Sequence, residues 1–128
     1  MANNQLTTIN LEVLKHCSKL QSLSLSGNKL KTINLTPLAN CSNLKGLDLS
    51  KNRITAIDLF PLDKCYELQV LHLFSNELTE IDLDPLFISN LRHLTLYDNR
   101  LTQENLDEKR FFLNRDRLLI EADPQRIE

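Results

Sequence analysis

An asparagine recurs along this chain at an almost constant spacing, and it is always accompanied by the same leucines. The spacing is 24 residues three times and then 23. A constant period of this length is typical of solenoids, in which each repeat forms one coil and stacks on the next. The asparagines are Asn4, Asn28, Asn52, Asn76 and Asn99. The period therefore constrains the fold before any single residue is interpreted.

From Leu20 onward the shared pattern is LxxLxLxxN(L/I)xxIxLxPLxxC. Leucines that alternate with variable residues have the two-residue period of a strand with one buried face. We therefore predict one domain over residues 1–128. Its parts are a partial repeat or N-terminal cap at 4–19, full repeats at 20–43, 44–67 and 68–90, a last partial repeat at 91–102 and a C-terminal cap at 103–128.

The asparagine of each repeat follows the second leucine of the predicted strand, where the chain must turn. An asparagine side chain carries two donors and an acceptor, so it can bond backbone groups that a turn leaves unpaired. We therefore expect buried, structural side chains at Asn28, Asn52, Asn76 and Asn99.

A proline later in the repeat predicts short helices on the side opposite the strands. Thr36-Pro37 and Asp84-Pro85 are interpreted as an N-cap followed by proline at the first helical position. The next repeat begins within a few residues, so these helices can have only about one turn.

The repeats resemble the leucine-rich-repeat family over residues 4–102. This resemblance implies an α/β fold, a right-handed solenoid with a parallel β-sheet on the concave face and short helices or turns on the convex face. Extracellular members usually carry cysteine-rich caps, which are absent, so the chain looks like a cytosolic member with repeats of 23–24 residues, and a cytoplasmic location is implied. The repeats also look similar to those of Asgard archaeal and some bacterial proteins.

Composition argues against several classes of partner. The net charge of −2 and the pI near 5.9 give no basic footprint for nucleic acid or an anionic membrane. No apolar run has the length of a membrane span, and the first residues lack the basic and apolar regions of a signal peptide. Nothing in the sequence calls for a cofactor.

Cys17, Cys41 and Cys65 occupy the same repeat position, and Ile88 takes that position in the next repeat. A position that accepts either cysteine or isoleucine is interpreted as a small apolar core slot. A disulfide set or a metal site is the alternative. Their odd number argues against the first, and parallel stacked side chains argue against the second.

The resemblance also suggests where a partner binds, because variable strand residues of this family face the concave, binding surface. Among them, Val70, Phe74 and Tyr97 would form an apolar patch with aromatic anchors. Alternatively, the C-terminal segment covers these residues, or they only pack across strands. The candidate partner-binding residues are Asp48, Val70, His72, Phe74, His93, Thr95 and Tyr97.

The same face holds residue types found in catalytic sites, but their order does not suit catalysis. Ser24, Asp48, His72 and Thr95 fall in one row across the predicted sheet, with Asp48 between Ser24 and His72. A hydrolase triad needs the histidine in the middle, so we expect only a hydrogen bond between Asp48 and His72. Convergence of Asp48, His72 and His93 on a metal is likewise disfavoured. We predict no enzyme activity and no metal site.

The sequence thus predicts a non-enzymatic module that binds another protein, neither nucleic acid nor membrane, on its concave face. The alternative is a structural or regulatory segment of a larger signalling protein or enzyme. The open edge before Leu20 also favours self-association. At the other end, we expect a helix near 104–110 and a strand or helix near 117–122 to cover the last repeat.

Overall fold

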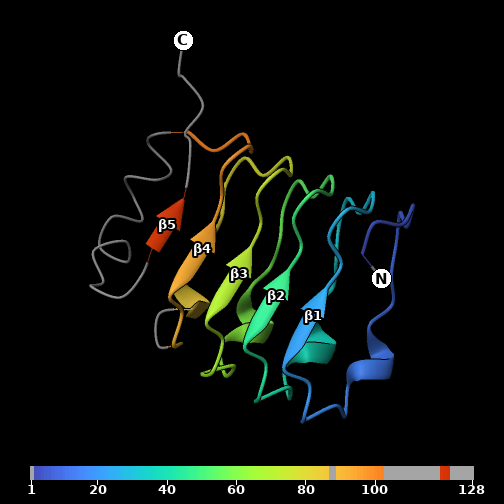
Figure 1. Ribbon diagram of the computed structural model, residues 1–128, viewed down its shortest axis with the longest axis vertical. Helices are drawn as coiled ribbons and strands as arrows, with labels where there is room; N and C mark the ends of the chain where they lie inside the picture. The colour runs from blue at the N-terminus through green and yellow to red at the C-terminus, as the bar shows by residue number, and fades with distance from the viewer. Residues whose placement is uncertain (1, 87–88, 103–118, 122–128) are drawn as a thin grey trace.

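Short strands alternate with 3-10 helices in the computed structural model, which describes residues 2–86, 89–102 and 119–121 (Figure 1). The helix expected near 104–110 and the core position Ile88 lie outside these residues. The elements in chain order are η1 (Glu12–Leu14), β1 (Ser22–Ser24), η2 (Thr36–Leu38), β2 (Gly46–Asp48), η3 (Phe60–Leu62), β3 (Val70–His72), η4 (Asp84–Leu86), β4 (His93–Thr95) and β5 (Leu119–Glu121).

The strands form one parallel sheet in the order β1-β2-β3-β4-β5. Equivalent residues of successive repeats pair with one another, as in Leu23 with Leu47 and Leu47 with Leu71. β5 pairs with β4, so of the strand or helix expected near 117–122 the strand is the one observed, and it extends the sheet. The sequence period is therefore also the register of the sheet.

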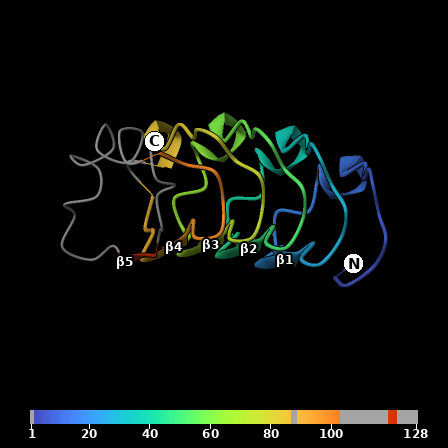
Figure 2. The same ribbon diagram turned by 90° about the horizontal axis from the view of Figure 1, so that it is seen from above.

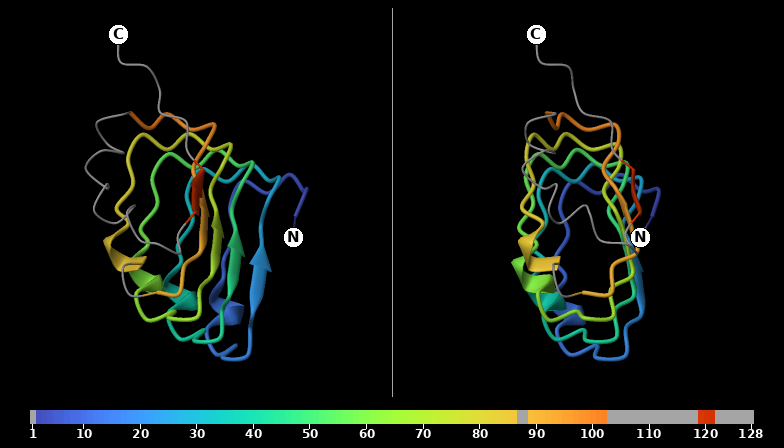
Figure 3. Two further views of the ribbon diagram at one scale, coloured as in Figure 1. Left: turned by 60° about the vertical axis from the view of Figure 1, so that its left-hand side comes forward. Right: turned by 90° about the vertical axis from the view of Figure 1, so that its left-hand side faces the viewer.

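The sheet and the helices form two opposite walls of a flattened coil. Figure 2 shows the strands in one row and the 3-10 helices in a second row across from them. In Figure 3 successive turns of the chain overlie one another when viewed along the stack. Among the described residues, no helix combines the length and the apolar character that a membrane crossing requires.

A continuous leucine spine fills the space between these walls. The leucine directly after each of β1 to β4 is almost completely buried, with exposures of 0, 0, 0 and 1% at Leu25, Leu49, Leu73 and Leu96. The backbone N–H groups of Leu25, Leu49 and Leu73 continue the ladder; that of Leu49, for example, donates to the His72 carbonyl at 2.9 Å. Equivalent leucines thus lie side by side, which confirms the stacking of coils predicted from the period. Because each coil buries its leucines against its neighbours, stability belongs to the array.

The repeat asparagines are buried and bond to the preceding coil as well as to their own. Asn52 Nδ2 donates to the carbonyls of Leu49 and Ser50, both at 3.1 Å, and to Leu25 of the preceding coil at 3.0 Å. Its Oδ1 accepts the Leu30 N–H at 3.1 Å. The equivalent bonds of Asn76 and Asn99 follow the same pattern. These side chains therefore form an asparagine ladder that joins successive coils.

The sharp backbone turn lies one residue before each asparagine. Gly27, Lys51, Ser75 and Asp98 all have positive φ values, between 56° and 76°. Only Gly27 is free of the steric cost that an L side chain carries in this region. Space also favours glycine there, because a Cβ atom at residue 27 would collide with Asn3 Oδ1 and lie 3.1 Å from the backbone N and Cα atoms of Asn3.

The predicted helix caps are wrong in their position. Thr36 lies inside η2, whose N-cap is Leu35 without a side-chain bond. The capping oxygen comes instead from two residues earlier, where Asn34 Oδ1 accepts the Thr36 N–H at 3.0 Å. Asn10, Asp58 and Asp82 accept the equivalent N–H groups at 2.9–3.0 Å. A short side chain that bonds the backbone two residues on forms an Asx turn, which leads the chain into each helix.

The cysteine position is a core slot, as predicted. Cys41 and Cys65 have no exposed surface, and their thiols lie 3.6 to 4.0 Å from backbone carbonyl oxygens. Burial raises the pKa of both thiols, that of Cys65 to about 11, with a smaller contribution from Cys41 and then Asp63 in the latter case. Cys17 at the first coil is half-buried.

Candidate protein-binding face

Aromatic and imidazole rings gather on the outward face of β3 and β4. His72 contacts Phe74 edge to face, with ring centroids 5.8 Å apart and planes at 76°. It contacts His93 in the same manner at 5.4 Å and 85°. Phe74 and Tyr97 stack at 4.8 Å with planes only 9° apart. We call His72, Phe74, His93 and Tyr97 the ring cluster.

The cluster follows directly from strand periodicity and register. Residues 72 and 74 lie on the same face of their strand because side chains alternate, as do residues 93 and 97. The pairing of Val70 with His93 aligns the two coils. The separation of the Phe74 and Tyr97 rings is thus close to the strand spacing of about 4.8 Å. Each ring in this row rests on its neighbour instead of extending freely into solvent.

The ring cluster keeps exposed surface despite these contacts. Tyr97 is 37% exposed, and Val70, His72, Phe74 and His93 are half-buried. The rings do pack across strands, but that packing leaves part of each one uncovered.

Thr95 differs from the other candidate binding residues because it is only 2% exposed. Its Oγ1 lies 3.0 Å from His72 Nδ1, within hydrogen-bond distance. It therefore has little surface to offer a partner, and its evident role is to orient the imidazole of His72. Sequence periodicity could not reveal this, since it assigns a face and not an exposure.

Asp48 occupies the boundary between the ring cluster and a half of the sheet with small side chains. Its Oδ1 accepts the N–H of Ser50 at 3.0 Å and the hydroxyl of Ser50 at 2.6 Å. The Ser50 oxygen lies 3.0 Å from the Ser26 hydroxyl, which extends the chain of bonds to the first coil. The expected bond between Asp48 and His72 is wrong, because His72 Nδ1 is paired with Thr95 and Asp48 with Ser50.

The row that holds the catalytic residue types has the predicted order. Ser24 pairs with Asp48 and Asp48 pairs with His72, so the carboxylate lies between the hydroxyl and the imidazole. This order cannot pass a proton from serine to histidine directly. In the described residues, no group of three or more His, Cys, Asp or Glu side chains is arranged to hold a metal ion.

Charged residues directly after the repeat asparagines border this face. Arg100 and Glu77 form an ion pair with 3.2 Å between Nη2 and Oε1, and their side chains are 65% and 35% exposed. Such an exposed pair contributes at most about 1 kcal/mol to stability. Lys29 and Arg53 hold the same position in earlier coils.

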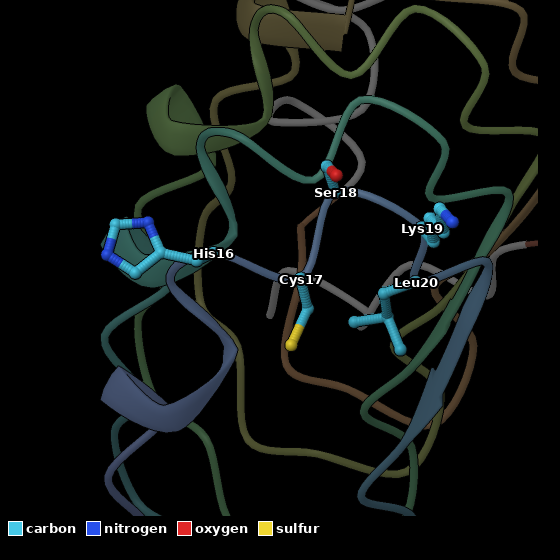
Figure 4. Close-up of a pocket in the computed structure, with 5 residues that line it drawn as sticks. All are labelled: His16, Cys17, Ser18, Lys19 and Leu20. Carbon is cyan, nitrogen blue, oxygen red and sulfur yellow. The ribbon is translucent and has the colours of Figure 1, made fainter.

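Two features away from the sheet face were not anticipated from the sequence. Phe60 and Tyr66 are 58% and 53% exposed. Residues 16–20 line an open hollow of about 490 Å³ beside the first coil, where Cys17 and Leu20 point the same way and His16 points elsewhere (Figure 4). A single short segment lines this hollow without converging polar groups, so it lacks the features of a ligand pocket.

Comparison with known proteins agrees with the observed fold. A family model described as "Leucine rich repeat" matches residues 1–54 and 19–78. A leucine-rich-repeat protein of Leptospira interrogans has 32% identity and a TM-score of 0.80 over 93% of this chain. An internalin of Listeria monocytogenes has 27% identity and a TM-score of 0.66 over 94% of this chain.

The chain spans only 29% of the Leptospira protein and 34% of the internalin. No curated protein matches it. Repeats of this kind are generally protein-interaction modules. The family match, the solenoid neighbours and the stacked coils together show that the chain belongs to the leucine-rich-repeat family.

Proposed function

We propose that this chain binds a protein partner on the concave sheet face, without catalysis, and that the ring cluster is the centre of the contact. The observation that carries the proposal is the stacked pair of Phe74 and Tyr97, which keeps aromatic surface exposed on a parallel sheet. Aromatic side chains supply large contact areas and are enriched among residues that dominate binding energy.

Rigidity supports the same proposal. Each ring of the cluster contacts at least one other ring, and His72 is also held by Thr95. Side chains that are already fixed lose little conformational entropy when a partner binds. Asp48 and Val70 flank the cluster and complete the proposed contact surface.

The test compares two pairs of aromatic substitutions. Phe74→Ala with Tyr97→Ala should weaken binding of a captured and purified partner by at least tenfold. Phe60→Ala with Tyr66→Ala removes similar exposed aromatic surface elsewhere and should leave the affinity within about twofold. The opposite ranking would place the interface away from the sheet and reject the proposal.

We also propose that the chain self-associates through the outer edge of β1. Among the described strands β1 pairs with β2 alone, so its other edge lies at the end of the sheet. Leu23 of β1 and Leu20 just before it are half-buried, as is Leu14 of η1 in the same first coil. A strand edge next to apolar side chains favours pairing with another chain. Light scattering should show mass growing with concentration, and Leu23→Lys should abolish that growth. A strict monomer at millimolar concentration contradicts the proposal.

A further inference from the structure

The carboxylate of Asp48 uses one of its two oxygens in its described hydrogen bonds. Both of its described hydrogen bonds come from Ser50 and reach the same oxygen, Oδ1. Because the Ser50 hydroxyl donates to Asp48, the hydroxyl of Ser26 is the donor in its bond to Ser50. This chain of donors fixes the orientation of the carboxylate, and Oδ2 takes part in none of these bonds.

Asp48 also lacks a cationic partner in the part of the chain that the structure describes. The ion pair found there joins Arg100 to Glu77. Lys45 lies three residues before Asp48, or roughly 10 Å along an extended strand, and Lys51 lies beyond it at the sharp turn. A charge about 10 Å away is largely screened at physiological salt, so Lys45 does not neutralise the carboxylate.

Small residues lie on one side of this carboxylate, where Ser24 pairs with Asp48, and rings lie on the other. Gly46 is on the same face of β2, and a Cβ atom added there would meet only Ser22 Oγ at 3.9 Å. The register partner of Asp48 on the far side is His72, which contacts Phe74 and His93. Asp48 therefore lies where a shallow surface of small residues meets the ring cluster, and we call this position the step.

We propose that this step is a subsite for an arginine side chain of the protein partner. The guanidinium of this arginine would donate to Asp48 Oδ2. The aliphatic part of the side chain would lie over Gly46, and the guanidinium plane would pack against the ring cluster. Arginine suits the step better than lysine because its planar group both stacks on rings and forms charge-assisted hydrogen bonds with carboxylates. The inference rests on the proposed concave binding face and adds the chemistry of one contact.

The test selects peptides from a displayed random library against the full chain. We expect an arginine at a recurrent position of the selected peptides. For one synthetic peptide, Asp48→Asn should weaken binding by about tenfold or more, the usual worth of a hydrogen bond between charged groups. Asparagine keeps the oxygen that accepts from Ser50, so the fold should survive. Asp63→Asn removes the same charge at an exposed site outside the sheet and should leave affinity unchanged.

A second variant on the peptide keeps the test decisive if Asp48→Asn does not fold. Replacement of the arginine by citrulline, its neutral isostere, should cost a similar factor. In a double-mutant cycle, citrulline should cost little more once Asp48→Asn is present, because both changes remove one interaction.

The outcomes separate the subsite from the binding face. Peptides that depend on Phe74 and Tyr97 but bind Asp48→Asn equally well overturn the subsite and leave the proposed function standing. Peptides indifferent to all of these residues overturn both. A selection without any peptide that depends on Asp48 overturns the arginine subsite.

Discussion

The asparagine ladder gives the most specific stability prediction, and Asn52→Ala tests it in the middle of the array. The substitution leaves the buried N–H of Leu30 without its acceptor, Asn52 Oδ1. The two leucine carbonyls involved lose less, because Leu25 O still accepts from Asn28 and Leu49 O from Asn76. The main cost is therefore one orphaned donor.

An unsatisfied buried donor costs about 1–3 kcal/mol. With the weakened carbonyl bonds added, we expect a total loss of about 2–4 kcal/mol in the free energy of unfolding. Urea titration followed by circular dichroism should show a lower midpoint at an unchanged slope. Asn43→Ala is the matched control, because Asn43 also bonds across coils, to Ser18 O at 2.8 Å, but at an exposed position. Its loss should stay below about 1 kcal/mol. Equal losses for both variants would refute the ladder argument.

Asn52→Asp refines the same prediction, because it keeps the shape and the Oδ1 acceptor. A carboxylate would replace the Nδ2 donor opposite three carbonyl oxygens at 3.0–3.1 Å. These oxygens should raise the pKa of the new carboxyl in the folded state above its unfolded value of about 4. Stability is then retained below pH 4 and lost as the pH rises. The loss in the free energy of unfolding, relative to the native chain, should therefore be larger at pH 7 than at pH 4. A pH-independent difference would contradict this reading.

Three further changes test other parts of the structure. Gly27→Ala should destabilise the chain by about 1–3 kcal/mol, measured by urea unfolding, because a Cβ there collides with Asn3 at a positive φ. Asp58→Ala should cost about 1 kcal/mol in the same assay through loss of the Asx turn before η3. Native labelling with a thiol reagent at pH 8 should modify Cys17 before Cys65, whose folded-state pKa is raised to about 11 by burial. Because the folded-state pKa of Cys65 is raised from 9.0 to about 11, its contribution to stability is complete below pH 9 and is lost as the pH rises through 11.

The solenoid could be predicted well from the sequence because every coil has the same pattern of leucine and asparagine positions. The leucine positions, the buried asparagines and the cysteine slot all follow from a period that also sets the strand register. The inter-coil reach of Asn52 was not predicted, since a repeat considered alone does not show which coil accepts its bonds. The Asx turns were not predicted, although their side chains recur at a fixed spacing, as Asn10, Asn34, Asp58 and Asp82. The reason is that the N-cap was assigned to the residue directly before the proline.

The candidate site was predicted less completely than the fold. Period and register place Phe74, Tyr97, His72 and His93 on one face, but they do not determine the contacts between side chains. The stacking of two rings and the pairing of His72 with Thr95 depend on rotamers. The same limit explains why Asp48 was assigned to His72 when its nearest donors belong to Ser50.

Amide chemical-shift mapping during titration with a selected peptide tests the central claim, that the sheet face is where a partner binds. We expect the largest changes in residues 46–50, 70–75 and 93–98, with Phe60 and Tyr66 unaffected. Changes concentrated around Phe60 and Tyr66, with the amides of β2, β3 and β4 unmoved, would contradict it.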